Sequence, residues 1–145
     1  MTRAPHLFLK AALLWMCAAS SAAHADLYVV VQSNNPVQSM TKLEVRDLFM
    51  GRTRAFTNGS FAQPFDLSRN HQSRAAFHHA LTGLSQAQVN SYWSRLVFSG
   101  QTLPPQTLDD ESTMRDAILR NANAIGYLSQ PPTDPALRVV LVLKE

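Results

Sequence analysis

The sequence predicts an α/β domain in which a mixed sheet is flanked by helices. Apolar runs over residues 27–31 and 139–143 are rich in β-branched side chains, as is typical of strands buried on both faces. Between them, several segments carry apolar residues at helical spacing and begin at good capping residues. A chain that mixes buried strands with amphipathic helices favours a layered α/β domain.

Residues 1–25 have the features of a cleavable export signal. Arg3 and Lys10 give it a basic start, and the apolar run that follows is too short to span a bilayer comfortably. An Ala-His-Ala sequence ending at Ala25 has the form of a signal peptidase site. A retained membrane anchor is the alternative. We expect cleavage after Ala25, a periplasmic location, no membrane attachment after cleavage, and one mature domain over residues 26–145.

Removing this signal changes the composition in ways that bear on function. Cys17 is the single cysteine of the chain, so the mature domain has no disulfide, thiol nucleophile or cysteine metal ligand. Two of the 13 basic residues lie in the signal, so 11 basic residues face 10 acidic ones in the mature chain. A nearly neutral domain gives no indication of a nucleic-acid surface.

Four helices are predicted from capping residues and apolar spacing. Two of them begin with a Ser/Thr-x-x-Glu/Gln capping box, one at Thr41 and one at Ser85. A third has an apolar stripe that starts at Phe77, and a fourth begins with acidic residues that suit the positive end of a helix dipole. The predicted ranges are 41–51, 71–82, 85–100 and 110–121.

The remaining segments are predicted from shorter patterns. Asn58-Gly59 is a tight-turn pair between aromatic positions, which predicts a hairpin over residues 52–66. Residues 103–105 are predicted to form a stiff proline-rich connection, and residues 124–128 a short strand. The predicted order is therefore one strand, one helix, two hairpin strands, three helices and two strands.

A polar segment before the 71–82 helix is the candidate ligand site. It follows a strand and leads into a helix N-terminus, whose free N–H groups and positive dipole favour anions. Hydroxyl groups and arginines beside such a helix end can supply further contacts. The candidate ligand-binding residues are Ser68, Arg69, His71, Ser73 and Arg74. A solvated loop with a serine cap is the alternative.

Other chemistries have less support in the sequence. His71, Arg74 and His78 share one face of the predicted helix, but no carboxylate is spaced to complete a metal site, and exposed surface histidines are common. A Ser-His-Asp set can be drawn with Asp66, but the chain has no G-x-S-x-G elbow. It also has no Walker loop and no dinucleotide fingerprint. No metal ligand, cofactor or catalytic residue is therefore assigned.

Several motifs of the mature chain resemble the periplasmic phosphate-binding proteins of ABC importers. The resemblance rests on Arg-Asp-Leu-Phe-Met-Gly-Arg over 46–52, on Tyr92-Trp93 with Phe-Ser-Gly over 98–100, and on Ala-Ile-Gly-Tyr over 124–127. It is strongest to a group of small exported proteins that resemble this family. It implies the fold of one lobe of a type II periplasmic binding protein, because the chain is too short for two lobes.

The resemblance also implies a ligand and partners. The family places a Gly-Ser-Gly-Thr-Arg-like motif at the start of the helix, where this chain has Asn-His-Gln-Ser-Arg over 70–74. It implies phosphate or a similar oxyanion as ligand, contacted by Ser73 and Arg74, with Ser68, Arg69 and His71 secondary. If His71 contributes, the affinity should rise as the ring becomes protonated. An ABC importer or another periplasmic protein is the implied partner.

These inferences lead to an exported, non-catalytic, solute-binding-like module. One alternative is an interaction module that keeps the fold without a ligand and presents the former inter-lobe cleft to a partner or a second copy. A hydrolase is the other alternative.

Overall fold

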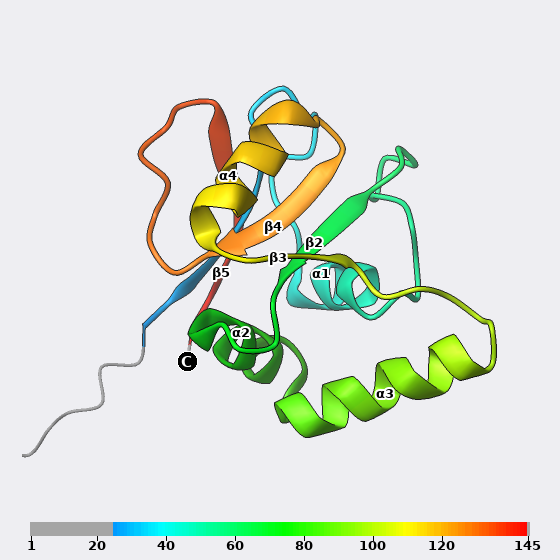
Figure 1. Ribbon diagram of the computed structural model, residues 1–145. Coiled ribbons are helices and arrows are strands. Elements are labelled where there is room, and N and C mark those ends of the chain that lie inside the picture. The colour runs from blue at the N-terminus through cyan, green and yellow to red at the C-terminus, as the bar shows by residue number, and fades with distance from the viewer. Residues whose placement is uncertain (1–24, 145) are drawn as a thin grey trace, which may run out of the picture.

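The computed structural model describes residues 25–144, in which a five-stranded mixed sheet is flanked by four helices (Figure 1). Apart from Ala25, the predicted signal peptide lies outside the described residues. The strands are β1 (Leu27–Gln32), β2 (Gln63–Leu67), β3 (Gln106–Leu108), β4 (Ala124–Leu128) and β5 (Leu137–Leu143). The helices are α1 (Lys42–Phe49), α2 (Gln72–Thr82), α3 (Gln86–Phe98) and α4 (Glu111–Arg120). The predicted α/β class with a mixed sheet is confirmed.

The strands lie in the order β3-β2-β4-β1-β5. β1 lies between β4 and β5 and is antiparallel to both, whereas β2 lies between β3 and β4 and is parallel to both. Val29, Val30 and Val31 of β1 are fully buried. The continuous β-branched run therefore marks a strand covered on both faces, as predicted.

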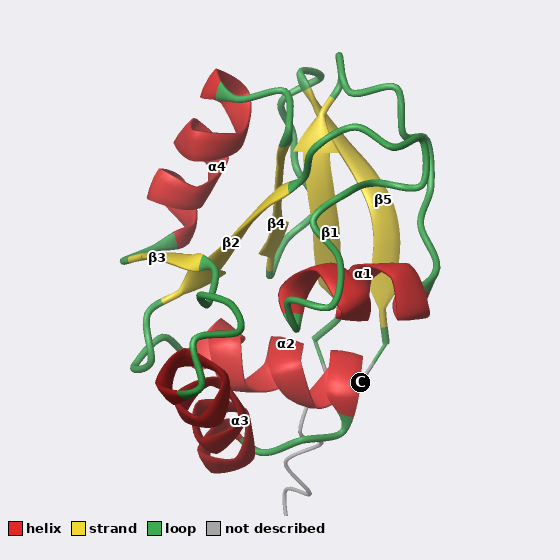
Figure 2. Cartoon of the chain, turned by 90° about the vertical axis from the view of Figure 1, so that its right-hand side faces the viewer, coloured by secondary structure: helices red, strands yellow, loops and turns green. Residues whose placement is uncertain are grey.

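Different helices cover the two faces of the sheet (Figure 2). On one face, Met114 and Ile118 of α4 lie over Gly126 of β4. Tyr127 follows in β4 and stacks on Phe77 of α2, with ring centroids 3.7 Å apart. Because successive strand residues point to opposite faces, α4 and α2 lie on opposite sides of the sheet.

An aromatic cluster forms the core between the sheet and helices α1 and α2. Phe49 of α1 meets Phe77 edge-on, with centroids 4.8 Å apart, and Tyr127 at 6.2 Å. All three rings are fully buried. Each aromatic pair of this kind is worth about 0.5–1.5 kcal/mol beyond the area it buries. The cluster fixes α1 and α2 against β4, and α3 packs against α2 at the edge of the domain (Figure 1).

Two glycines are required by close packing. A Cβ at Gly126 would lie 3.0 Å from Ile118 Cδ1 and even closer to Met114 Sδ, so α4 can approach β4 only because this residue has no side chain. Gly51 has a φ of +70° just after α1, a conformation that glycine adopts without strain. A Cβ there would lie 2.8 Å from the Trp93 indole of α3.

The predicted helix starts are confirmed by their hydrogen bonds. Both predicted capping boxes form, Thr41 with Glu44 and Ser85 with Gln88. In each, the cap side chain accepts a hydrogen bond from the backbone N–H three residues on. The side chain three residues on accepts one from the backbone N–H of the cap. Asp110 caps α4 within the predicted acidic start. Within residues 25–144, no helix is both long and apolar enough to cross a membrane.

The strand predictions between residues 52 and 108 were partly wrong. The predicted hairpin is reduced to a tight turn and an isolated antiparallel bridge between Ala55 and Phe61. Its expected second strand is β2, which instead pairs in parallel with β3 and β4. β3 was missed because it has only three residues and its side chains are largely exposed, so it shows neither alternation nor an apolar run.

Candidate functional site

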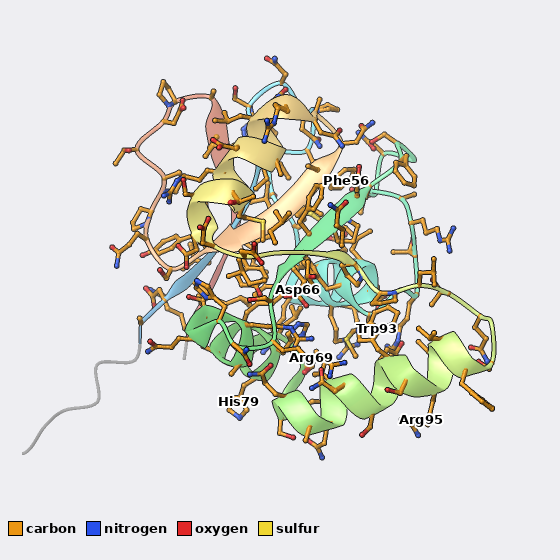
Figure 3. All side chains as sticks on the ribbon, in the orientation of Figure 1. Phe56, Asp66, Arg69, His79, Trp93 and Arg95 are labelled. Atoms are coloured by element: carbon orange, nitrogen blue, oxygen red, sulfur yellow. The ribbon has the colours of Figure 1, made fainter. Side chains whose placement is uncertain are left out.

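The candidate site lies at the carboxyl ends of the parallel strands β2, β3 and β4. From this edge, β2 leads through residues 68–71 into α2, β3 leads into α4, and β4 is followed by Ser129. Open α/β sheets usually bind ligands at such an edge. Figure 3 shows Asp66 and Arg69 in this region, between β2 and α3.

His71 caps the start of α2. Its Nδ1 accepts a hydrogen bond from the backbone N–H of Ser73 at 3.2 Å. The backbone N–H of Ser73, at the helix end predicted to bind an anion, is therefore already hydrogen-bonded to a side chain. Protonation of His71 would add a positive charge here, but it would also remove the acceptor that caps the helix.

The hydroxyl of Ser73 is engaged by a carboxylate. Ser73 Oγ donates to Glu111 Oε1 at 2.9 Å. Glu111 also accepts from the backbone N–H of Ser129 at 3.1 Å to each carboxylate oxygen, and from Ser129 Oγ at 3.1 Å. A single half-buried carboxylate thus joins the start of α2, the start of α4 and the end of β4.

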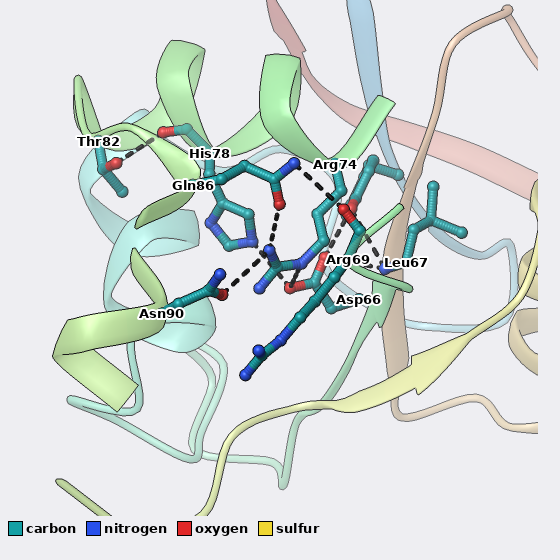
Figure 4. A network of polar contacts seen from close by, with 9 residues as sticks. Asp66, Leu67, Arg69, Arg74, His78, Thr82, Gln86 and Asn90 are labelled. Carbon is teal, nitrogen blue, oxygen red and sulfur yellow. Dashed lines mark hydrogen bonds and ion pairs between the residues drawn. The ribbon is translucent and has the colours of Figure 1, made fainter. Parts of the chain in front are cut away.

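Arg74 is buried and takes part in an internal network (Figure 4). Its Nε donates to Asp66 Oδ2 at 3.2 Å, and one terminal nitrogen donates to Gln86 Oε1 at 2.5 Å and to Asn90 Oδ1 at 3.4 Å. This arginine links β2, α2 and α3. Removing one partner of a buried ion pair is costly, because the other charge is left without compensation.

Asp66 is the centre of this network. Besides Arg74, its carboxylate accepts from the Tyr127 hydroxyl at 2.6 Å and lies 2.8 Å from His78 Nε2. Burial alone would raise the pKa of Asp66, but the hydrogen bond and charge of His78, the Tyr127 hydroxyl and the charge of Arg74 outweigh it and hold the pKa below its usual value. Burial, and then the negative charge of Asp66, raises the pKa of Tyr127 well above its usual value, so this phenol remains a donor.

His78 is a core residue and not an exposed one, contrary to the expectation from the sequence. Its side chain is fully buried and packs edge-on against Phe77, with ring centroids 5.3 Å apart. Nε2 donates to the ionised Asp66, and Nδ1 has no hydrogen-bond partner among the described residues. The sequence spacing correctly placed His78 and Arg74 on the same face of α2, but that face points into the core.

Ser68 and Arg69 form the outer part of the site. The backbone N–H of Ser68 donates to Leu108 O at 2.9 Å, which ties the loop to β3. The carbonyl of Arg69 accepts from Gln86 Nε2 at 3.2 Å. The Arg69 side chain is exposed beside a shallow groove along α3, and its guanidinium makes no hydrogen bond or ion pair within residues 25–144. Of the predicted arginines, Arg69 is therefore the one whose charge faces solvent.

The site has no assembled nucleophile. Ser73 donates to a glutamate and not to a histidine, and no serine hydroxyl within the described residues is hydrogen-bonded to His71 or His78. Nor do residues 25–144 hold a group of three or more His, Cys, Asp or Glu side chains arranged for a metal ion. The chemistry that this geometry offers is binding through hydroxyl, N–H and guanidinium donors.

Several residues at this edge were not predicted from the sequence. Glu111 was predicted only to suit the positive end of its helix dipole, and Tyr127 only to lie in a strand. No role was predicted for Gln86, Asn90 or Ser129. A partial signal was present for Tyr127, which closes the Ala-Ile-Gly-Tyr motif at the end of β4. The others come close only through packing between segments distant in the chain, so no local pattern marks them.

No protein-family model matches the sequence, and no curated protein matches it. Among solved structures, one from Clostridium perfringens, assigned as a phosphate ABC transporter substrate-binding protein and holding bound phosphate, is similar with a TM-score of 0.63 at 20% identity. That match covers 80% of this chain and 45% of the other. An ABC-type phosphate transport receptor from Vibrio cholerae is similar with a TM-score of 0.60 at 16% identity, over 80% of this chain and 46% of the receptor.

A third similar structure, assigned as a phosphate binding protein, comes from Planctomyces limnophilus. Its TM-score is 0.51 at 13% identity, over 72% of this chain and 36% of the other. The chain thus spans less than half the length of each of these three structures. At such low identities the likeness concerns the fold, and the described part of this chain has the fold of about one lobe of the substrate-binding proteins of phosphate ABC transporters.

Proposed function

We propose that the mature chain, residues 26–145, is an exported, non-catalytic module that binds phosphate or a similar oxyanion. The site is the edge formed by the start of α2, the start of α4 and the end of β4. The observation that carries this proposal is the convergence of neutral donors there, two serine hydroxyls and a backbone N–H, around one negatively charged group. Such donors beside a helix N-terminus suit a small oxyanion.

The predicted ligand residues take different parts in this proposal. Ser73 supplies a hydroxyl, and the exposed Arg69 supplies a guanidinium that can swing toward a bound anion. Ser68 and His71 shape the loop that leads into α2. Arg74 fixes α2 against β2 and α3, because its side chain is held by Asp66, Gln86 and Asn90. An importer or another periplasmic protein is the proposed partner.

Inorganic phosphate should bind to the mature protein, and Arg69→Ala should weaken this binding about tenfold, the loss of one charge-assisted contact. Isothermal titration calorimetry on both proteins measures the change. Arg120→Ala is the matched control, since Arg120 is an exposed arginine at the far end of α4. Arg74→Ala is less suited to this test because it also leaves Asp66 without its arginine. Absence of binding heat across several buffers, even at the highest phosphate concentration that can be used, would count against the proposal.

An interaction module is the second candidate, and exposed apolar side chains favour it. Phe98 is 96% exposed, Leu103 75% and Phe61 58%. Leu103 and Phe61 border an apolar cavity of about 250 Å³ whose wall includes Trp93. Apolar side chains gathered beside a cavity often mark an interaction surface.

If this surface joins two copies, light scattering should give a mass above that of a monomer for the wild type. The double substitution Phe61→Ser, Leu103→Ser should return the mass to that of a monomer. Leu43→Ser is the control, because Leu43 is also exposed but lies at the start of α1. A monomeric wild type at high concentration that also captures no periplasmic protein would count against this candidate.

A further inference from the structure

The side chain of Glu111 does not serve its own helix. Asp110 is the N-cap of α4, and its Oδ1 accepts the N–H of Thr113 at 2.7 Å. Glu111, the first residue of α4, instead extends to Ser73 of α2 and to Ser129 after β4. Both of these residues belong to segments remote from Glu111 in the sequence. Its role is therefore not helix capping.

The groups around this carboxylate are all donors. The hydroxyls of Ser73 and Ser129 and the backbone N–H of Ser129 point to its two oxygens, at 2.9–3.1 Å. An ionised carboxylate accepts hydrogen bonds and donates none, and the same holds for the oxygens of a fully ionised oxyanion. The donors of the proposed phosphate site are thus already held by an anion that belongs to the protein.

The charges near Glu111 bear on whether a second anion can bind. Arg74 is paired with Asp66, and Asp110 lies next to Glu111 with its pKa lowered, chiefly by hydrogen bonds from Thr113. The guanidinium of Arg69 is exposed, and Arg115 lies one helical turn after Glu111 in α4. Each donor hydrogen serves one acceptor at a time and two nearby anions repel each other, so we expect phosphate to compete with the Glu111 carboxylate for these donors.

We propose that Glu111 is a tethered internal ligand that occupies the oxyanion donors of this lobe and sets whether external phosphate can bind. The inference rests on the proposed function. Phosphate binds by displacing the glutamate, which moves out toward solvent. A tethered competitor acts at an effective concentration of about millimolar or more, so the native affinity for phosphate is weak. The residue thus restricts the site to anions that compete well for serine and N–H donors.

Titration of inorganic phosphate into Glu111→Gln and Glu111→Ala tests this inference. Both variants should bind phosphate at least about tenfold more tightly than the wild type. Asp109→Asn is the matched control, because Asp109 is exposed before the same helix and its side chain makes no hydrogen bond among the described residues. The control removes the same charge without freeing the donors, so its affinity should change less than about threefold. Circular dichroism checks that each variant is folded.

A second measurement separates the inference from the proposed function. In the amide NMR spectrum, the Ser129 resonance should shift in Glu111→Ala and shift again when phosphate is added to that variant. Equal phosphate affinity in wild type and Glu111→Ala overturns the inference and leaves the proposed function standing. Weaker binding by Glu111→Ala also overturns it, since the glutamate would then be a contact for the ligand. If neither protein binds phosphate, both the inference and the proposed function fail.

Discussion

Replacing Asp66 with asparagine is expected to lower the free energy of unfolding by about 3–5 kcal/mol, the typical cost of breaking a buried ion pair. The carboxylate is 2% exposed and is the common acceptor for Arg74, His78 and Tyr127. An amide has similar size but no charge, so Arg74 would remain buried without a counterion. Because whole domains of this size are stable by only about 5–15 kcal/mol, the variant should be near the limit of folding at ambient temperature.

Urea denaturation followed by circular dichroism measures this loss. Asp116→Asn is the control, because Asp116 is exposed on α4, and its stability should stay within about 0.5 kcal/mol of the wild type. If Asp66→Asn lost less than about 1 kcal/mol, the ion-pair network would contribute little to the fold.

The same carboxylate predicts the acid response. The folded protein lowers the pKa of Asp66, so its contribution to stability is complete above the unfolded value of about 3.9. That contribution is lost as the pH falls below this value toward the folded pKa. Between pH 5 and pH 2, the wild type should therefore lose more stability than Asp66→Asn.

Replacing Phe77 with alanine is expected to cost about 3–5 kcal/mol as well, through a cavity in the aromatic cluster. The ring is fully buried, stacks on Tyr127 with an interplanar angle of 5° and meets Phe49 edge-on. Its removal takes the nearest aromatic partner from both neighbours and loosens α2 against β4. Thermal unfolding and urea denaturation both report this change.

Phe98→Ala is the matched control for this variant. Phe98 is 96% exposed at the end of α3, so the same truncation should alter stability by less than about 0.5 kcal/mol. Equal losses in the two variants would contradict the assignment of the core to the Phe77 cluster.

Much of the fold could be predicted because its signals are local. The capping boxes at Thr41 and Ser85 define helix starts within a few residues, and the valine run of β1 needs no partner to be recognised. The pairing of β2 could not be predicted. A turn such as Asn58-Gly59 indicates that the chain reverses, but not that the strand after the turn pairs with the segment before the turn. Here the neighbours of β2 come from residues 106–108 and 124–125.

The internal partners of the candidate site residues could not be predicted from the sequence, for a related reason. The segment at 68–74 was predicted as a site because it joins a strand to a helix, which is a local feature. Whether a polar side chain there faces a ligand or an internal partner depends on residues far along the chain. Arg74 is held by Asp66, Gln86 and Asn90, and Ser73 by Glu111. Spacing along one helix cannot show such partners.

The sheet order has a consequence for how the chain reaches its native state. β1, the first of the described strands to leave the ribosome, pairs with β4 and β5, which begin 97 and 110 residues after it. Contacts of such long sequence separation slow folding, since the ends of a long segment must meet before any pairing is gained. The apolar β1 must therefore remain without its strand partners until nearly the whole domain has been synthesised. A nascent chain that stops before residue 137 would lack β5 and would expose one edge of β1 to other strands.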